Sequence, residues 1–307
     1  MSVLILTQPS PPEATAQAVR AIAPDIVCRT DLGQADLADI DAVMAWRLPE
    51  GLASQLPRLG LVCSVGAGVE KVLASDLPAE IPVTRIVDGR VNQGIAQYVA
   101  LMALRHAREL PRYERQQKEH AWLRQAQDMV QPRVGLLGVG STGVVIAQAL
   151  QALGFMVRGW STRPRPDLLF PCEHGAGGLD VCLAQADILV LALPLTPDTA
   201  GLLNKSSLAK LPRGAYVINV GRGGHLVEQD LIALVRAGQL AGAALDVQQQ
   251  EPMPAEHPLW EVPGITITPH IAAQASLAST VAQFVECYRA LQAGQPIPRC
   301  IDRRRGY

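Results

Sequence analysis

The sequence predicts an α/β protein of two domains, each built on a parallel sheet. Short apolar runs alternate with helical patterns along the chain, which is typical of parallel strands joined by helices. The 307 residues are 49% hydrophobic and 18% charged, a composition that suits large buried faces. A glycine-rich turn begins only at Gly138, so a whole α/β region precedes it.

The first domain is predicted to open with a strand and a helix. The helical pattern covers 13–22, and Pro24 ends it. Short apolar runs bounded by turn residues predict the strands of this domain, at 3–7, 42–46, 59–63 and 82–85. Strands that alternate with longer connections indicate a parallel sheet.

A long helix is predicted next, over 92–110, with Pro111 as its stop. It is apolar on several sides, as expected of a buried linking helix. The following segment, 111–131, is polar and charged but contains Tyr113 and Trp122. Two interpretations stay open: a solvated helix, or an arm that contacts a second copy of the chain.

The second domain is predicted to cover 93–274. Its apolar runs predict strands at 133–138, 156–160, 187–192, 215–219, 241–246 and 264–268. An amphipathic helix follows near 277–291, and the chain after 275 is too short for a core of its own. We therefore expect 275–307 to pack on 1–92, which makes the first domain discontinuous.

Three glycines in the second domain have the spacing of a dinucleotide-binding turn. Gly138, Gly140 and Gly143 follow an apolar run and precede a helical pattern that starts with Ser141 and Thr142. The first glycine allows a tight turn, the second a close approach of phosphate, and the third close helix–strand packing. These five residues are predicted to bind a dinucleotide in a Rossmann domain.

Charge and cysteine spacing exclude several classes of function. The net charge of −1 gives no field that favours nucleic acid or a membrane surface. No apolar run approaches a membrane span of about 18 residues. The six cysteines lie far apart, so neither a metal centre nor a disulfide framework is predicted. Reduced thiols and the lack of a secretory signal predict a cytoplasmic protein.

Three motifs at predicted strand ends carry candidate catalytic residues. Arg222 follows the run 215–219, Glu251 follows 241–246, and His270 follows 264–268. Each residue alone has an ordinary structural interpretation, as a surface arginine, a turn residue or a buried histidine. Ligands in open α/β sheets bind at the carboxyl ends of strands, so the convergence of all three at one edge favours a site.

These residue types suit carbonyl reduction by hydride transfer. A histidine can give the proton that the carbonyl oxygen needs. A neighbouring carboxylate fixes its tautomer and favours its charged form. An arginine binds a carboxylate through paired hydrogen bonds and stabilises charge that develops on oxygen.

At this point the chain resembles the D-isomer-specific 2-hydroxyacid dehydrogenase family, from 64 to 273. The resemblance includes the strand-end motifs and the segments 64–70, 194–199 and 226–231. Segments 43–46 and 301–307 resemble the glyoxylate/hydroxypyruvate reductase group of that family. Two positions depart from the pattern: Gly221 stands where Ala or Ser is frequent, and Gln97 where an acidic residue is common.

The resemblance implies a role for each matching residue. Arg222 would bind the substrate carboxylate, and His270 would act as acid and base with Glu251 as its partner. Further substrate contacts are implied at Trp46, Arg47, Gly66, Ala67 and Gly68. Further cofactor contacts are implied at Leu193, Pro194, Thr199, Val220, Gly221, Arg222, Asp246 and His270. The family also implies a flavodoxin-like substrate domain and a homodimer formed through the cofactor domain.

The loop after the second strand of the Rossmann domain predicts which dinucleotide binds. NAD sites place an acidic residue there, on the ribose hydroxyls. This chain has Ser161, Thr162 and Arg163, and its first acid is Asp167. Hydroxyl and guanidinium donors suit a 2′-phosphate, which predicts NADPH over NADH. The alternative is a basic loop that only faces solvent.

The sequence therefore predicts an NADPH-dependent reductase of small 2-ketoacids such as glyoxylate or hydroxypyruvate. Two alternatives stay open: another dehydrogenase of the family, and a nucleotide-sensing binding protein of the same fold.

Overall fold

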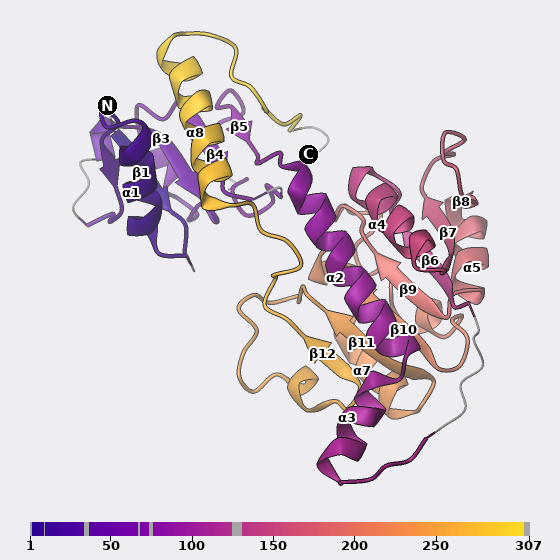
Figure 1. Cartoon of the computed structure of the whole chain (residues 1–307). Helices are drawn as coiled ribbons and strands as arrows, with labels where there is room; N and C mark the ends of the chain where they lie inside the picture. Colours follow the sequence, from indigo (N-terminus) through magenta and orange to yellow (C-terminus); the bar gives the residue numbers. More distant parts are fainter. Residues whose placement is uncertain are drawn as a thin grey trace. The chain divides into compact units, whose positions relative to one another are not determined.

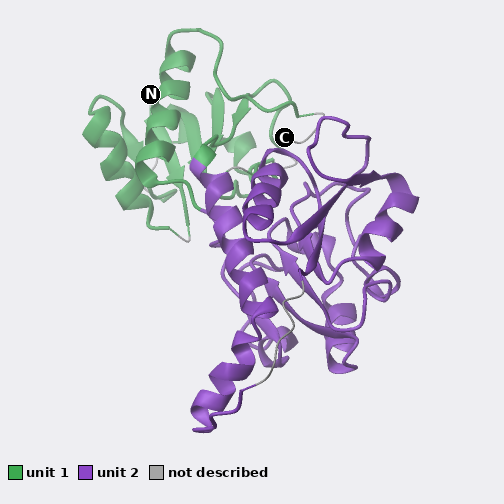
Figure 2. Ribbon diagram, turned by 45° about the vertical axis from the view of Figure 1, so that its right-hand side comes forward, with its two compact units in different colours: residues 1–89, 274–307 green, residues 90–273 purple. Residues whose placement is uncertain are grey.

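The computed structural model describes residues 2–8, 10–33, 37–66, 68–73, 76–124 and 131–303 (Figure 1). The predicted substrate residue Ala67 lies outside these ranges, as do part of the 111–131 segment and residues 304–307 of the C-terminal motif. The chain divides into two compact units (Figure 2). Unit 1 comprises Met1–Gly89 and Gln274–Tyr307, and unit 2 comprises Arg90–Ala273.

Unit 1 contains a parallel sheet of five strands within the described residues. The strands are β1 (Ser2–Leu6), β2 (Cys28–Arg29), β3 (Ile40–Ala45), β4 (Leu61–Ser64) and β5 (Val83–Thr84). Their order, β2-β1-β3-β4-β5, is the flavodoxin-like order. The predicted fold of the first domain is confirmed.

The two faces of this sheet are covered differently. Helices α1 (Pro12–Ile22) and α8 (Leu277–Gln292) pack on one face, where Phe284 and Tyr288 of α8 join the core formed by Val3 and Ile5 of β1. The other face is covered by connecting segments, which include the short 3₁₀ helices η1 (Leu37–Asp39) and η2 (Ala53–Gln55). The C-terminal helix therefore completes the core of the N-terminal region.

Unit 2 contains a parallel sheet of seven strands, again counted over the described residues. They are β6 (Arg133–Leu137), β7 (Met156–Ser161), β8 (Cys172–His174), β9 (Ile188–Leu191), β10 (Ala215–Asn219), β11 (Leu240–Leu245) and β12 (Ile265–Ile267). The order β12-β11-β10-β9-β6-β7-β8 is the Rossmann order with one strand added at the β12 edge. The predicted Rossmann fold is confirmed.

Helices cover both faces of the seven-stranded sheet. Helices α2 (Gly89–Ala107) and α4 (Ser141–Ala152) pack on one face, and α5 (Gly175–Ala184), α6 (Lys205–Leu208) and α7 (Glu228–Arg236) pack on the other. Neighbouring residues of β10 show the alternation: Val217 joins one core and Ile218 the other. The short 3₁₀ helices η3 (Gly223–His225) and η4 (Pro258–Glu261) lie in connections after β10 and before β12.

Pro111 starts a helix in the structure, so the prediction that it ends one was wrong. Helix α2 ends at Ala107, Glu109 takes a left-handed φ of 50°, and α3 (Leu110–Lys118) then begins with Pro111 in its first turn. The fixed φ of proline suits that position, where its missing N–H has no intrahelical partner. Beyond α3, the side chain of Trp122 is 98% exposed.

Within the described residues, no helix is both long enough and apolar enough to cross a membrane.

Candidate active site

The order of the seven-stranded sheet reverses between β6 and β9, its central neighbours. Strands β7 and β8 extend the sheet on the β6 side, and β10 to β12 extend it on the β9 side. Ligands of such sheets bind outside the carboxyl ends of the strands at this point. The predicted glycine turn leaves β6 there, and the loop containing Leu193, Pro194 and Thr199 leaves β9.

The three glycines of the turn have three different surroundings. Gly138 has a φ of 100°, and a Cβ there would lie 2.6 Å from the carbonyl oxygen of Ala192. A Cβ on Gly143 would lie 2.0 Å from the carbonyl oxygen of Gly138, so helix α4 approaches the turn as closely as backbone allows. At Gly140 a Cβ would meet nothing within 4 Å. The turn is thus crowded at its two outer glycines and open at the middle one.

Arg222 lies in a loop that its own side chains hold in shape. Buried Asn219 accepts a hydrogen bond from the N–H of Gly221 at 3.1 Å and donates one to the carbonyl of Arg222 at 3.0 Å. The half-buried guanidinium of Arg222 donates to the carbonyl of Gly221 at 2.8 Å. Val220 joins the loop to β9 through its N–H, which donates to the carbonyl of Leu191 at 3.1 Å.

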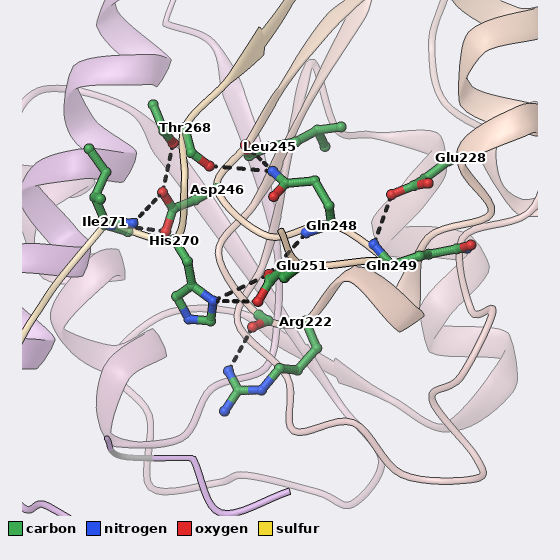
Figure 3. A network of polar contacts seen from close by, with 12 residues as sticks. Arg222, Glu228, Leu245, Asp246, Gln248, Gln249, Glu251, Thr268, His270 and Ile271 are labelled. Atoms are coloured by element: carbon green, nitrogen blue, oxygen red, sulfur yellow. Dashed lines mark hydrogen bonds and ion pairs between the residues drawn. The ribbon is translucent and has the colours of Figure 1, made fainter. Parts of the chain in front are cut away.

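The Arg222 loop touches the turn that carries Glu251. A Cβ on Gly223 would lie 2.0 Å from the carbonyl carbon of Gln248, so only glycine permits this approach. The N–H of Gln248 donates to Oε1 of Glu251 at 3.2 Å, which orients the carboxylate. Figure 3 shows the side chains of Arg222, Glu251 and His270 in one region of the site.

His270 and Glu251 form a direct pair. The Nδ1 atom of His270 lies 3.2 Å from Oε1 and 3.1 Å from Oε2 of Glu251 (Figure 3). A carboxylate only accepts hydrogen bonds, so Nδ1 carries a hydrogen and Nε2 is the nitrogen that can exchange a proton. Both side chains are partly accessible, at 28% for His270 and 18% for Glu251. The pair can therefore deliver a proton to a bound molecule.

Asp246 holds the turn on which His270 lies. Its carboxylate, in a residue that is 1% exposed, accepts from the hydroxyl of Thr268 at 2.6 Å and from the N–H groups of Ile271 and Ala272, both at 2.8 Å. These bonds keep His270 at an unusual φ of 56°. Oδ1 accepts two of these hydrogen bonds and Oδ2 accepts one, and the cofactor contact that the family resemblance implies for Asp246 stays a prediction.

A tyrosine on the linking helix extends this network. The hydroxyl of Tyr98 in α2 lies 2.7 Å from Oγ1 of Thr268, and burial raises the pKa of Tyr98 to about 12. The phenol is therefore neutral at physiological pH and able to donate. The network joins α2 to the turn of His270 through Thr268 and Asp246.

The loop after β7 is more exposed than the turns that carry the candidate catalytic residues. Thr162 and Arg163 are exposed, and the hydroxyl of Ser161 donates to the carbonyl of Arg163. Arg165, which sequence reasoning passed over, donates to the carbonyl of Val139 inside the glycine turn. It also pairs with Asp167 at 2.7 Å, and this hydrogen bond lowers the pKa of the Asp167 carboxyl to about 2.

The substrate residues predicted in unit 1 gather at the carboxyl edge of its own sheet. The N–H of Trp46 donates to the carbonyl of Leu6 at 2.9 Å, which places Trp46 where the strand order reverses between β1 and β3. A Cβ on Gly66 would lie 3.0 Å from the indole of Trp46. Ser64 accepts from the N–H of Gly66 at 3.2 Å and donates to the carbonyl of Gly68 at 2.7 Å. Arg47 is exposed.

Sequence reasoning missed three residues that shape this edge of unit 2. Asn219 and His225 are wholly buried in the Arg222 loop, and Arg165 reaches the glycine turn. A polar residue that closes an apolar strand, as Asn219 does, was the one available signal. His225 contacts Pro194, 31 residues away, and Arg165 contacts Val139, 26 residues away, so local sequence could not identify these contacts.

Comparisons with known proteins agree with this geometry. The family model described as D-isomer specific 2-hydroxyacid dehydrogenase, NAD binding domain, matches residues 100–272. Glyoxylate/hydroxypyruvate reductase A of Serratia proteamaculans (strain 568) is 38% identical over 275 residues, which cover 87% of this chain and 88% of the relative.

Solved structures also match nearly the whole chain, among them two that were determined with a bound cofactor. The D-isomer specific 2-hydroxyacid dehydrogenase of Xanthobacter autotrophicus Py2, in complex with NADPH and MES, has a TM-score of 0.87 at 38% identity and covers 100% of this chain and 99% of its own. The NADPH-dependent glyoxylate/hydroxypyruvate reductase of Sinorhizobium meliloti, in complex with NADP and sulfate, has a TM-score of 0.89 at 33% identity, with 100% of both chains covered. The chain therefore belongs to the D-isomer-specific 2-hydroxyacid dehydrogenase family.

Proposed function

We propose that this protein reduces small 2-ketoacids of the glyoxylate and hydroxypyruvate type to 2-hydroxyacids, with NADPH as the hydride donor. The pairing of His270 with Glu251, at 3.1 Å and at the same sheet edge as Arg222, carries the proposal. This pair supplies the proton and the arginine supplies the carboxylate contact that reduction of a 2-ketoacid requires.

The residues of the glycine turn fit a bound dinucleotide. Gly140 leaves open space beside the N-terminus of α4, where backbone N–H groups attract phosphate. When bound, NADPH supplies the hydride. Ser141 and Thr142, the first residues of α4, would contact the pyrophosphate. Further contacts to the cofactor would come from the loops after β9 and β10, at Leu193, Pro194, Thr199, Val220 and Gly221.

The loop after β7 supports a preference for NADPH. Ser161, Thr162 and Arg163 offer donors to a 2′-phosphate, and Arg165 adds a second guanidinium held beside the glycine turn. The complexes of the two solved relatives with NADPH and NADP agree with this preference.

The chemistry assigns one task to each residue of the site. Arg222 would bind the carboxylate of the ketoacid and stabilise charge on its carbonyl oxygen. His270 would give that oxygen a proton from Nε2, and Glu251 would hold the ring in the tautomer that allows this. Trp46, Arg47, Gly66, Ala67 and Gly68 stay predicted substrate contacts of unit 1, which we take to be the substrate domain.

We also propose a cytoplasmic homodimer. Helix α3 and the segment after it carry large exposed apolar side chains, with Trp122 at 98% and Leu123 at 64% exposure, as expected of a contact surface in unit 2. Light scattering at micromolar concentration should give twice the chain mass of 32.8 kDa. A monomer would contradict the dimer and leave the proposed reaction untouched.

One assay tests the reaction. The purified protein is mixed with a panel of 2-ketoacids and either NADPH or NADH, and oxidation of the cofactor is followed by absorbance. We expect turnover of glyoxylate and hydroxypyruvate, with a higher kcat/KM for NADPH. Tight NADPH binding without turnover of any ketoacid would instead show a nucleotide-sensing protein and overturn the proposal.

A further inference from the structure

His225 is a fully buried histidine beside the site, and the proposed reaction gives it no task. It ends the short helix η3, and its side chain is 0% exposed. Two polar contacts of its ring lie within the described residues. The backbone N–H of Arg222 donates to Nδ1 at 3.1 Å, and Nε2 lies 3.2 Å from the carbonyl oxygen of Pro194.

These two partners determine the protonation of the ring. A backbone N–H only donates, so Nδ1 must be without hydrogen. A carbonyl oxygen only accepts, so Nε2 must carry one. Both contacts are made only by the neutral ring in its Nε2–H form, since the charged ring would turn an N–H toward the N–H of Arg222.

The partners belong to loops that leave neighbouring strands of the sheet. Arg222 follows β10, and Pro194 follows β9. The carbonyl of Pro194 also accepts from the hydroxyl of Thr199 at 2.9 Å, so His225 joins a loop that is already closed on itself. A Cβ on Gly221 would lie 3.1 Å from both Cε1 and Nδ1 of the ring. The absence of a side chain at Gly221 therefore leaves space for the imidazole.

We propose that neutral His225 is a positioning residue that fixes the backbone of Arg222 against the loop of Pro194. One nitrogen positions the residue proposed to bind the ketoacid, and the other positions a loop proposed to bind the cofactor. Removal of each contact should therefore affect a different kinetic constant. This inference rests on the proposed function.

Three substitutions separate the two contacts. His225→Asn keeps an acceptor near the position of Nδ1, and His225→Gln keeps a donor near the position of Nε2. We expect His225→Asn to raise the KM for NADPH roughly tenfold with little change in the KM for glyoxylate, and His225→Gln to do the reverse. His225→Phe keeps the ring but loses both contacts, and kcat/KM should fall on the order of 100-fold.

A core variant of the same unit controls for lost stability. Leu208→Ala removes a wholly buried side chain in α6, and it should lower Tm without a KM split. If the His225 variants lower Tm as Leu208→Ala does and likewise show no KM split, or if His225→Asn and His225→Gln behave alike, the inference is wrong. An inactive wild-type protein would instead contradict the proposed function.

The protonation of the ring gives a second test, read on the wild-type protein. In ¹⁵N-histidine NMR, His225 should show an unprotonated Nδ1 and a protonated Nε2 throughout the pH range of the assay. His257 has partners of the same kind, so the signal of His225 is identified by its loss in His225→Asn. A His225 ring that titrates in this range, or that is protonated at Nδ1, would overturn the inference.

Discussion

His270 and His106 lie at opposite ends of the seven-stranded sheet, and their surroundings differ. His270 follows the carboxyl end of β12, is partly accessible and has Glu251 as its partner at 3.1 Å. His106 lies at the amino end of β10, where its ring stacks on Tyr216 with 4.4 Å between centroids. Burial lowers the pKa of His106. The same residue type is thus paired with a carboxylate at one end, while at the other it is stacked on an aromatic ring and has a lowered pKa.

The difference between the two histidines is tested most directly by the same substitution at both. His270→Gln should lower kcat for glyoxylate about 10²- to 10⁴-fold, the usual contribution of a general acid. His106→Gln, the matched control, should leave kcat near that of the wild type. Steady-state assays at saturating NADPH check both. A His270→Gln enzyme with wild-type kcat would remove His270 from the chemistry.

The second prediction compares the carboxylates of the two edges. Asp246→Asn should lower the free energy of unfolding by about 2 kcal/mol, because an amide cannot accept all three hydrogen bonds of the buried carboxylate. Displacement of the His270 turn should also lower kcat by roughly 100-fold.

Asp187→Asn is the control for this prediction. Asp187 pairs with Arg133 at the amino edge, and its side chain is 35% exposed. Asp187→Asn should therefore lower the free energy of unfolding by less than about 1 kcal/mol and leave kcat unchanged. Urea unfolding and steady-state kinetics measure both variants. Equal losses of stability in the two variants would show that burial of Asp246 does not matter.

A third prediction concerns the exposed loop after β7, at the carboxyl edge. Arg163→Ala should lower the ratio of kcat/KM for NADPH over NADH roughly tenfold or more, since the charged hydrogen bond that we propose to the 2′-phosphate would be lost. Asp167→Asn should raise that ratio, because it frees Arg165 from its ion pair. Parallel assays with the two cofactors give the ratio. If it stays the same in both variants, this loop does not select the cofactor.

The smallest expected effect is the pH dependence of stability that His106 causes. Because its pKa is lowered in the folded protein, the unfolded chain takes up the proton first as pH falls. The contribution of neutral His106 to the free energy of unfolding is fully present above the ordinary histidine pKa of about 6.5. It is lost as the pH falls below that value toward the pKa of His106 in the folded protein. Because one proton is involved, the free energy of unfolding can change by at most about 1.4 kcal/mol per pH unit.

His106→Phe keeps the stacking on Tyr216 without a titratable group. Urea unfolding between about pH 7 and 5, a range that includes the ordinary histidine pKa, should therefore show a weaker pH dependence of the free energy of unfolding in this variant than in the wild type. The same pH dependence in the wild type and in His106→Phe would mean that His106 takes up a proton as readily in the folded protein as in the unfolded chain.

The fold and the candidate site differ in how far sequence predicted them. The run 215–219 predicted β10 with the bounds that the structure shows, because a short apolar run bounded by turn residues is a local signal. Strand β8 was not predicted, since Cys172–His174 has only three residues and no apolar alternation. Pro111 was misread because proline suits both a helix stop and a first turn, and only the left-handed Glu109 distinguishes them.

Within the site, too, local signals could be predicted and contacts between distant residues could not. Arg222, Glu251 and His270 could be selected from sequence because each follows a recognisable strand. Hydrogen bonds such as those of Asp246 to the N–H groups of Ile271 and Ala272 join residues more than twenty positions apart. No local pattern encodes such a pairing, so the sequence could suggest the candidate catalytic residues but not the contacts that orient them.

The close contact at Gly223 has a consequence for altering this enzyme by laboratory evolution. Its Cβ position lies 2.0 Å from the backbone of Gln248, while that of Gly224 meets only the flexible side chain of Leu195, at 3.0 Å. Codon randomisation at 223 should therefore return almost only the parent residue, whatever substrate is selected. A library built around position 224 and the 161–167 loop would sample many more folded variants from the same number of clones.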